Sequence, residues 1–283
     1  MRRLALVLGA GGQLGEAMTE QLTVRHEVVP RSRTDVDVTR AEALREAVHG
    51  ICPDVIINCS AYTNVDRAEQ EPLDALAVNA WAVRTLARAA NEIDAALVHY
   101  STDFVFDGET DRPYTEKDSP NPRSTYGTSK LLGEWFAQEA KRHYVLRVES
   151  LFGGTRARST IDRMATELGG GRSVRAFSDR TVSPSYVDDV VDATRRLIGS
   201  SASPGIYHCV NSGWTTWAGV AREVARLIGA PERAVEDIPV SAAGLTVSRP
   251  QFAALSNARL TAAGIRMPTW QDALARYLSA KAD

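Results

Sequence analysis

A tyrosine and a lysine four residues apart form a candidate acid–base pair. Tyr126 and Lys130 are separated by Gly-Thr-Ser, and this spacing places two side chains on one face of a helix. Only 4 of the 33 basic residues are lysines. A phenol with its usual pKa near ~10 transfers protons poorly at neutral pH. An ammonium nearby favours the phenolate, so we expect Lys130 to lower the pKa of Tyr126 and make it a general acid–base group.

A hydroxyl residue is the third candidate. Thr102 follows a mostly apolar segment over 95–100 that predicts a buried strand. Open α/β sheets bind ligands at the carboxyl ends of their strands. We therefore expect Thr102 to hydrogen-bond both the Tyr126 oxygen and a substrate carbonyl, and so hold them at reacting distance. Ser, Thr and Asp after a strand often only cap a loop, and that alternative stays open.

Three glycines at fixed spacing indicate a dinucleotide site. Gly9, Gly12 and Gly15 follow the apolar run Leu4–Leu8 and precede a helical pattern. In this context Gly9 permits a tight turn, Gly12 lets backbone N–H groups approach a diphosphate, and Gly15 lets helix and strand pack closely. The start of the helix adds partial positive charge. A glycine turn used only for packing is the alternative.

The end of the second predicted strand favours NADPH over NADH as the cofactor. A carboxylate there would bind the ribose 2′-hydroxyl of NAD. The sequence instead has Arg31, Ser32 and Arg33, and a guanidinium suits a 2′-phosphate because its planar fork of donors is permanently charged. NADH use and a purely solvent-facing role for the arginines remain alternatives.

The elements that must position these residues alternate along the chain. Strands are predicted over 4–8, 28–29, 54–58, 95–100, 144–147 and 205–208, and helices over 14–22, 41–48, 72–90, 129–141, 161–168, 187–198, 217–228, 256–263 and 270–280. This order predicts an α/β fold, a Rossmann-type doubly wound parallel sheet with a smaller, interwoven C-terminal substrate lobe. We expect residues 1–147 to form the NADP-binding domain, with 187–230 returning to it, and 148–186 and 231–283 to form the substrate lobe.

Composition excludes several classes of protein. The chain has 283 residues, is 44% hydrophobic and 24% charged, and has a net charge of −2. These values are typical of a globular protein without a general nucleic-acid surface. No apolar run reaches the ~20 residues that span a bilayer, and Leu4–Leu8 is too short for a signal-peptide core. The 3 cysteines have no metal-ligand spacing, so we expect no metal and a reducing, cytoplasmic location.

These motifs together resemble the dTDP-4-dehydrorhamnose reductase family, within the extended short-chain dehydrogenase/reductases. The resemblance runs nearly end to end. It includes Gly9–Gly15, Asp37-Val38, Asn58–Asp66, Tyr100–Phe106, Tyr126–Lys130 with Gly133-Glu134, Ser178–Pro184, Thr215–Trp217 and Arg249-Pro250.

The resemblance implies a role for each matching residue. Tyr126 would donate the proton, Lys130 would hold the nicotinamide ribose, and Thr102 would orient the carbonyl. Cofactor contacts would come from Gly9, Gly12, Gln13, Leu14, Ser32, Arg33, Asp37, Val38, Ser60, Ala61, Tyr62, Tyr126 and Lys130. The substrate, a dTDP-4-keto-6-deoxyhexose, would meet Thr102, Asp103, Tyr126, Ser150 and Arg249, with Arg175 and Arg180 as further candidates for its diphosphate. The protein would be a monomer or a homodimer in deoxysugar or rhamnose biosynthesis.

Two departures separate the chain from the family pattern. The family usually has Thr-Ser-Trp-Val-Tyr-Gly after the residue equivalent to Arg147, and here Ser150 stands in place of that sugar-packing Trp. Some members also use an acidic residue just after the glycine turn to bind a metal at a dimer interface. At Glu16-Ala17 this chain does not have the acid in that position. The resemblance therefore leaves the identity of the hexose open. Trp214 and Trp217 resemble ligand-stacking groups, but aromatic residues at the start of a helix are more often core anchors.

Other activities use the same fold. Sugar-nucleotide 4,6-dehydratases carry Glu directly after Thr-Asp, where this chain has Phe104, so elimination lacks its acid–base group. An epimerase can use the same Tyr and Lys with tightly held NAD. The chain also resembles the regulatory subunit of methionine adenosyltransferase, which binds NADP without needing turnover. Intact Thr102, Tyr126 and Lys130 favour the reductase over this sensor.

Overall fold

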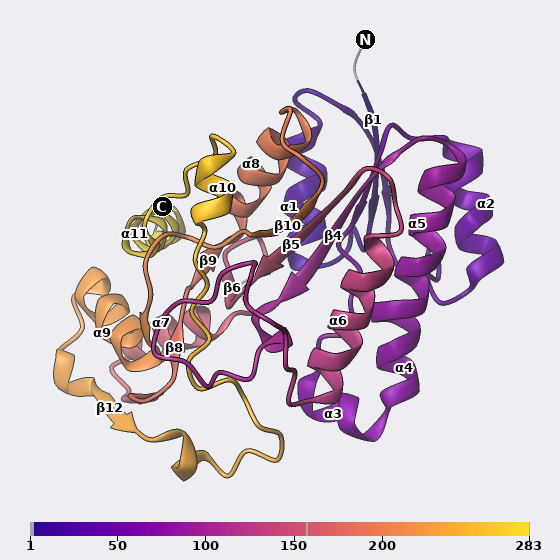
Figure 1. Cartoon of the computed structure of the whole chain (residues 1–283). Coiled ribbons are helices and arrows are strands. Elements are labelled where there is room, and N and C mark those ends of the chain that lie inside the picture. Colours follow the sequence, from indigo (N-terminus) through magenta and orange to yellow (C-terminus); the bar gives the residue numbers. More distant parts are fainter. Residues whose placement is uncertain (1–2, 157, 283) are drawn as a thin grey trace.

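The computed structural model describes residues 3–156 and 158–282. Strands and helices alternate through the first half of the chain, and most strands become shorter in the second half (Figure 1). The strands are β1 (Leu4–Leu8), β2 (Glu27–Arg31), β3 (Val55–Asn58), β4 (Ala96–Thr102), β5 (His143–Val148), β6 (Leu151–Phe152), β7 (Val174–Phe177), β8 (Thr181–Val182), β9 (Ser185–Tyr186), β10 (Gly205–His208), β11 (Thr215–Thr216) and β12 (Val235–Ile238). The α-helices are α1 (Gln13–Leu22), α2 (Ala41–Ile51), α3 (Val65–Gln70), α4 (Pro72–Leu76), α5 (Ala82–Glu92), α6 (Thr125–Ala137), α7 (Thr160–Gly169), α8 (Val187–Ile198), α9 (Trp217–Ile228), α10 (Ala258–Ala262) and α11 (Trp270–Ala282).

Six parallel strands form the central sheet, in the order β10-β5-β4-β3-β1-β2. The inner strands are apolar on both faces because helices cover both, as in β3, where all four residues are buried. The strand order reverses between β1 and β3, and this is where such sheets bind ligands. The predicted doubly wound parallel sheet is confirmed.

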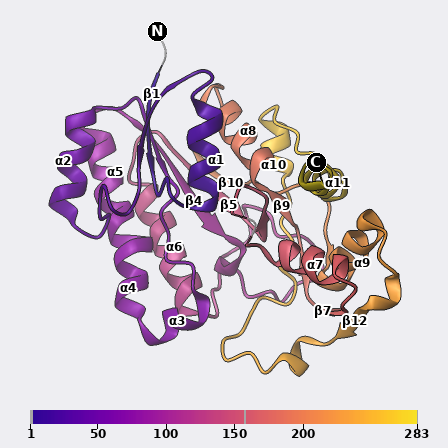
Figure 2. The same ribbon diagram turned by 180° about the vertical axis from the view of Figure 1, so that it is seen from behind.

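Each face of the sheet has its own helices. Apolar residues of α1 and α8 pack on one face, which is turned toward the viewer in Figure 2. Residues of α2, α5 and α6 pack on the other. The two hydrophobic layers hold the strands in register, so the carboxyl ends of β1, β3 and β4 meet at one edge.

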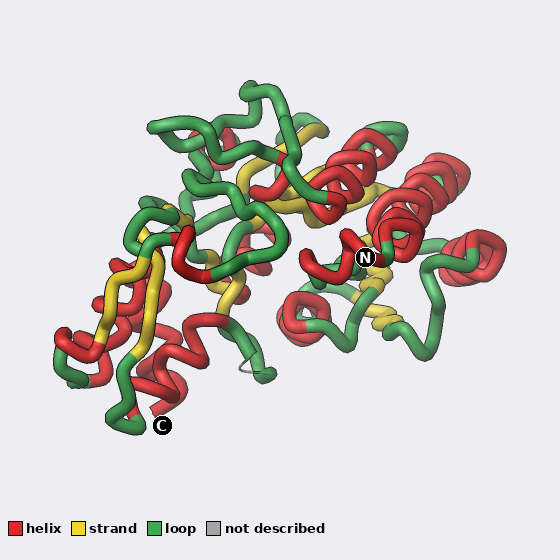
Figure 3. The backbone as a smooth tube through the Cα atoms, turned by 90° about the horizontal axis from the view of Figure 1, so that it is seen from below, coloured by secondary structure: helices red, strands yellow, loops and turns green. Residues whose placement is uncertain are grey.

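A smaller lobe lies beside that edge. Its core is formed by α7, α9, α11 and the short strands β7, β8 and β12. Figure 3 looks along the sheet from below and shows this lobe next to the sheet domain, with long loops on the side toward the viewer. The chain passes between the two parts more than once.

Two predicted helices have different limits. A helix predicted over 129–141 begins at Thr125, capped by the Ser124 hydroxyl, which accepts from the Gly127 N–H at 3.1 Å. The predicted helix over 72–90 is divided by a π-helical turn, Ala77–Trp81, between α4 and α5. Such turns are frequent at functional sites. The earlier start of α6 places Tyr126 in its first turn.

Residues of α8 and β10 pack in the core of the sheet domain, and residues of α9 pack in the core of the second lobe. Leu260, Ile265 and Met267 from the C-terminal region also join the core of the sheet domain. We therefore propose that the returning segment ends between β10 and α9, earlier than residue 230, and that residues near α10 return as well.

Candidate active site

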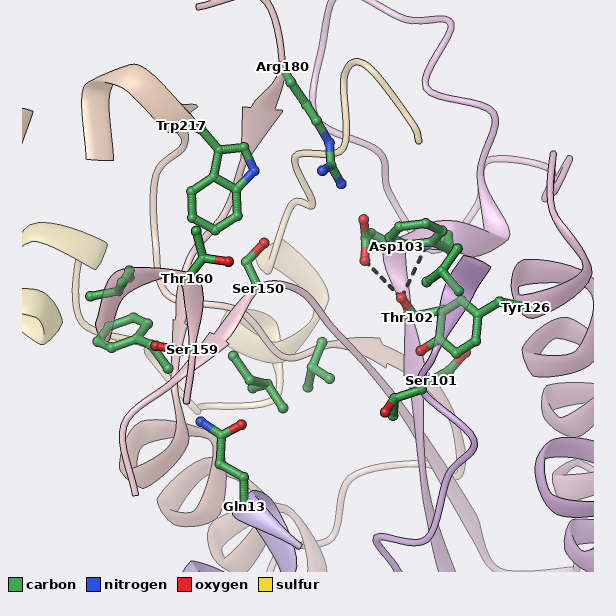
Figure 4. A pocket seen from close by; sticks show the side chains of 17 residues that line it. Gln13, Ser101, Thr102, Asp103, Tyr126, Ser150, Ser159, Thr160, Arg180 and Trp217 are labelled. Atoms are coloured by element: carbon green, nitrogen blue, oxygen red, sulfur yellow. Dashed lines mark hydrogen bonds between the residues drawn. The ribbon is translucent and has the colours of Figure 1, made fainter. Parts of the chain in front are cut away.

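A cavity of about 440 Å³ lies between the sheet domain and the second lobe. Both parts supply its walls (Figure 4). The sheet domain contributes Gln13, Thr63, Val65, Ser101, Thr102, Asp103, Phe104, Tyr126 and Val148, and the following segments contribute Ser150, Leu151, Phe152, Ser159, Thr160, Ile161, Arg180 and Trp217. A ligand here would contact both parts of the chain at once.

The structure brings Thr102 and Tyr126 together. Thr102 ends β4, and its hydroxyl donates to Asp103 Oδ1 at 2.8 Å and accepts from the Phe104 N–H at 3.3 Å. The Phe104 ring packs edge-on against Tyr126 with centroids 5.4 Å apart. Gly127 permits this approach, since a Cβ there would lie 2.3 Å from the Phe104 carbonyl oxygen. Thr102 and Tyr126 both line the same cavity.

Lys130 does not lower the pKa of Tyr126, and that prediction is wrong. Burial and the charge of Asp103 raise the pKa of Tyr126, with only partial compensation from the Thr102 hydroxyl. The Lys130 amine instead donates to the Tyr100 carbonyl oxygen at 2.6 Å and lies 3.4 Å from His99 Nε2. Burial lowers the pKa of Lys130 to about 8. Tyr126 is therefore a neutral phenol at pH 7, which is the form that donates a proton.

A buried ion pair supports the end of β4 from behind. Arg147 donates to Glu134 Oε1 and Oε2 at 2.8 and 2.7 Å, and both side chains are no more than 2% exposed. Ser101, next to Thr102, donates to Glu134 Oε1 at 2.5 Å. The pair therefore ties β4 and β5 to α6, which carries Tyr126.

The glycine turn has the geometry of a phosphate site. Gly9 has φ +71°, and an added Cβ would lie 2.7 Å from the Ser60 backbone nitrogen. At Gly15 a Cβ would lie 2.2 Å from the Gly9 carbonyl oxygen, so the helix could not pack there. Helix α1 begins at Gln13, and Gly12, its N-cap, provides no side-chain acceptor for the first amides. These free N–H groups fit a cofactor diphosphate.

The segment after β2 carries the residues predicted to choose the cofactor. The Ser32 hydroxyl donates to Asp35 Oδ2 at 2.7 Å, and this bond lowers the pKa of Asp35. The Arg33 side chain is exposed. Asp37 accepts from the Thr39 N–H at 3.0 Å, and Val38 packs against the core of the sheet domain. Arg33 is thus free to meet a 2′-phosphate, whereas the Ser32 hydroxyl has a partner.

The segment after β3 is fixed by an asparagine that the sequence analysis missed. Asn79 lies in the π-helical turn and accepts from the Tyr62 N–H at 2.9 Å. Its amide donates to the Tyr62 carbonyl at 3.0 Å and to the Ser129 hydroxyl at 2.9 Å. The predicted cofactor segment Ser60–Tyr62 is therefore tied to α6, beside Lys130. A lone asparagine in a helical pattern gave no signal of this role.

The arginines predicted to bind a diphosphate differ in position. Arg180 lines the cavity, and its guanidinium points toward Asp103 (Figure 4). Arg249 lies with its guanidinium 5.8 Å from the Phe104 ring and pairs with Asp66 Oδ2 at 2.7 Å. Arg175 is exposed on β7, 3.9 Å from Glu236, and is not among the residues that line the cavity. Arg180 and Arg249 are the candidates that the fold brings near the site.

Ser150 and Trp217 both line the cavity (Figure 4). Ser150 has φ +46°, a strained conformation that functional sites often retain. Trp217 begins α9, packs against the core of the second lobe and also lines the cavity, so it is both a packing residue and a candidate ligand contact. Trp214 is 47% exposed.

The comparisons with known proteins cover nearly the whole chain. The family described as "RmlD substrate binding domain" matches residues 2–282. The chain is 33% identical over 278 residues to the dTDP-4-dehydrorhamnose reductase of Mycolicibacterium smegmatis, covering 97% of this chain and 84% of that protein. It is 34% identical over 288 residues to the protein of the same name from Burkholderia thailandensis, covering 95% and 96%.

A solved structure has the same architecture. The dTDP-4-dehydrorhamnose reductase of Bacillus anthracis, in complex with NADP, matches with a TM-score of 0.93 and 30% identity over 99% of this chain and 100% of that chain. A UDP-glucose 4-epimerase from Thermus thermophilus, at 21% identity and a TM-score of 0.78, shares the fold. The chain therefore belongs to the RmlD substrate binding domain family, the family of the dTDP-4-dehydrorhamnose reductases.

Proposed function

We propose that this protein uses NADPH to reduce the 4-keto group of a dTDP-4-keto-6-deoxyhexose. The observation that carries the proposal is the meeting of Thr102 and the neutral phenol of Tyr126 in a cavity shared by both lobes. The relatives named above, similar over nearly the whole chain, support the same reaction. The role fits a pathway of deoxysugar biosynthesis in the cytoplasm, where NADPH is available and the free thiols of Cys52, Cys59 and Cys209 stay reduced.

Different residues of the cavity would carry out different parts of the reduction. When bound, the reduced nicotinamide supplies hydride to the carbonyl carbon. Tyr126 donates its phenolic proton to the carbonyl oxygen as negative charge develops there. Thr102 holds that oxygen beside the phenol, and because its hydrogen bond strengthens as charge grows, it favours the transition state over bound substrate.

Cofactor and substrate phosphates have separate partners. The first turn of α1 after Gly12 would bind the cofactor diphosphate, with Gln13 and Leu14 beside it. Tyr62 and Ala61 would contact the cofactor from the segment after β3, and Lys130 would reach the ribose from α6. Arg249 and Arg180 approach the Phe104 ring within 5.8 and 5.9 Å. They would hold the sugar-nucleotide diphosphate.

We expect Arg33→Ala to reduce discrimination between the two nicotinamide cofactors. Removing an exposed cation that meets a 2′-phosphate should raise KM for NADPH roughly tenfold and leave KM for NADH nearly unchanged. Steady-state kinetics with both cofactors would measure this. Arg25→Ala, which removes another exposed arginine, is the matched control. An equal change for both cofactors would remove Arg33 from the phosphate site.

A substrate panel tests the proposed reaction. Purified protein should consume NADPH, followed by the near-ultraviolet absorbance of the reduced nicotinamide, when given a dTDP-4-keto-6-deoxy sugar. NMR of the product should show a new hydroxyl at carbon 4. Epimerised sugar without net NADPH oxidation would favour an epimerase. Tight NADPH binding with no turnover on any sugar would favour the sensor function.

A further inference from the structure

A segment next to the second lobe packs against the start of α1. Residues 153–156 lie between β6 and α7 in the chain, and residues of both elements pack in the core of the second lobe. The Gln13 side-chain amide donates to the Gly153 carbonyl oxygen at 2.8 Å. A Cβ added at Gly154 would lie 3.5 Å from Gln13 Cγ. The segment therefore contacts the first residue of α1, beside the glycine turn.

Arg156 extends from this segment toward the glycine turn. Its Nη2 atom lies 3.9 Å from the position that a Cβ on Gly11 would occupy, and Ser32 Cβ lies 3.7 Å from the same position. Gly11 belongs to the turn, and Ser32 follows β2, where the cofactor 2′-phosphate is expected. Gly11 and Arg156 are both exposed, so a ligand can reach the space between them. The guanidinium thus lies beside both segments that would bind the phosphates of the cofactor.

The ion pair that Arg156 makes uses only one side of its guanidinium. Arg156 Nε lies 3.5 Å from Glu16 Oε2, and that oxygen has no hydrogen-bond partner among the described residues. The two side chains are 46% and 42% exposed, so solvent weakens this pair. Because Nε faces the glutamate while Nη2 faces Gly11, the far side of the planar group is directed at the turn.

A bound cofactor would bring strong negative charge to this position. A phosphate monoester carries about −1.5 to −2 charges at pH 7, and Glu16 already places a carboxylate in the first turn of α1. The guanidinium is a fork of five N–H donors that is always charged, and it can pair with two anions along different edges. Arg156 can therefore neutralise Glu16 and bind a phosphate at the same time.

We propose that Arg156 is a cofactor-binding residue that reaches a phosphate group of NADPH beside Gly11. The contact would join the segment after β6 to a cofactor held by the sheet domain. Both the 2′-phosphate and the diphosphate offer the required chemistry, and the proximity of Ser32 favours the 2′-phosphate. The inference rests on the proposed function for the identity of the cofactor, and it does not depend on which sugar is reduced.

Titration of the purified protein with NADPH, followed by fluorescence, tests the contact without any sugar. Arg156→Ala should raise the dissociation constant roughly tenfold, because a charged hydrogen bond to a phosphate is lost. The difference should shrink at high salt, since the group is partly exposed. Arg172→Ala removes another exposed arginine that pairs with a glutamate, Glu167, and should keep the wild-type value. An Arg156→Ala protein with wild-type affinity would overturn the proposal.

A double variant separates direct binding from an indirect effect of Glu16. If Arg156 only neutralises this carboxylate, then Arg156→Ala combined with Glu16→Gln should bind NADPH as tightly as Glu16→Gln alone. Direct binding predicts instead that the double variant remains roughly tenfold weaker than Glu16→Gln, because the two changes are then independent. Equal affinity of these two proteins would overturn the proposal.

Fragments of the cofactor identify the phosphate that Arg156 contacts. Adenosine 2′,5′-bisphosphate carries the 2′-phosphate without the diphosphate, and ADP carries the diphosphate without the 2′-phosphate. If calorimetry shows that Arg156→Ala weakens only the bisphosphate, the contact is to the 2′-phosphate; weaker binding of ADP assigns it to the diphosphate. Unchanged binding of both fragments would overturn the proposal and leave the proposed function intact. A wild-type protein that binds neither NADPH nor the fragments would overturn the proposed function itself.

Discussion

Replacing Tyr126 by phenylalanine should lower kcat by roughly two to four orders of magnitude. The substitution removes only the phenolic oxygen, so the carbonyl loses its proton donor while the ring keeps its edge-on contact with Phe104, 5.4 Å between centroids. Burial raises the pKa of this phenol, so the wild-type group is a proton donor throughout the neutral range. Steady-state kinetics under saturating NADPH and sugar would measure the loss.

Cofactor binding provides the internal check on Tyr126→Phe. The dissociation constant for NADPH, from fluorescence titration, should stay close to the wild-type value, because the glycine turn and the first turn of α1 are untouched. Tyr144→Phe removes another phenolic hydroxyl, which donates to the Ala202 carbonyl at 3.1 Å away from the cavity, and should retain wild-type kcat. A Tyr126→Phe enzyme with nearly full turnover would mean that another group donates the proton.

Replacing Arg147 by methionine should reduce the free energy of unfolding by about 3–5 kcal/mol. The change leaves Glu134 buried without its guanidinium partner, where two hydrogen bonds of 2.8 and 2.7 Å now hold it. It also removes the contact of the guanidinium with the Phe106 ring, at 4.8 Å. Urea unfolding followed by circular dichroism would give the difference.

A double variant separates the unpaired charge from lost packing. Arg147→Met with Glu134→Leu replaces the whole pair by apolar side chains and should recover most of the lost stability, because no buried charge remains. Arg88→Met, which breaks an exposed contact with Glu139 at 3.6 Å, should leave unfolding unchanged within error. If the double variant is no more stable than Arg147→Met, packing of the arginine and not charge pairing stabilises this region.

Much of the fold follows from local pattern. The apolar run at β1, the glycines after it and the alternation of strands with amphipathic helices predicted the parallel sheet, and the structure confirms it. The limits of elements were less predictable. Thr125 starts α6 because Ser124 caps it, and the π-helical turn at Ala77–Trp81 interrupts a pattern that reads as one continuous helix.

The site, like the fold, has some features that follow from local sequence pattern and others that depend on tertiary packing. Local pattern is enough to place Thr102 at the carboxyl end of a strand, and Tyr126 and Lys130 on one helix, because strand patterns and helix spacing are local properties. Helix spacing does not indicate that the Lys130 amine turns to the Tyr100 carbonyl. The order of elements does not indicate that Trp217 and Arg180 line the same cavity as Asp103. These residues come from segments far apart in the chain. Their distances, burial and pKa values depend on how two hydrophobic cores pack together, which spacing along the chain does not specify.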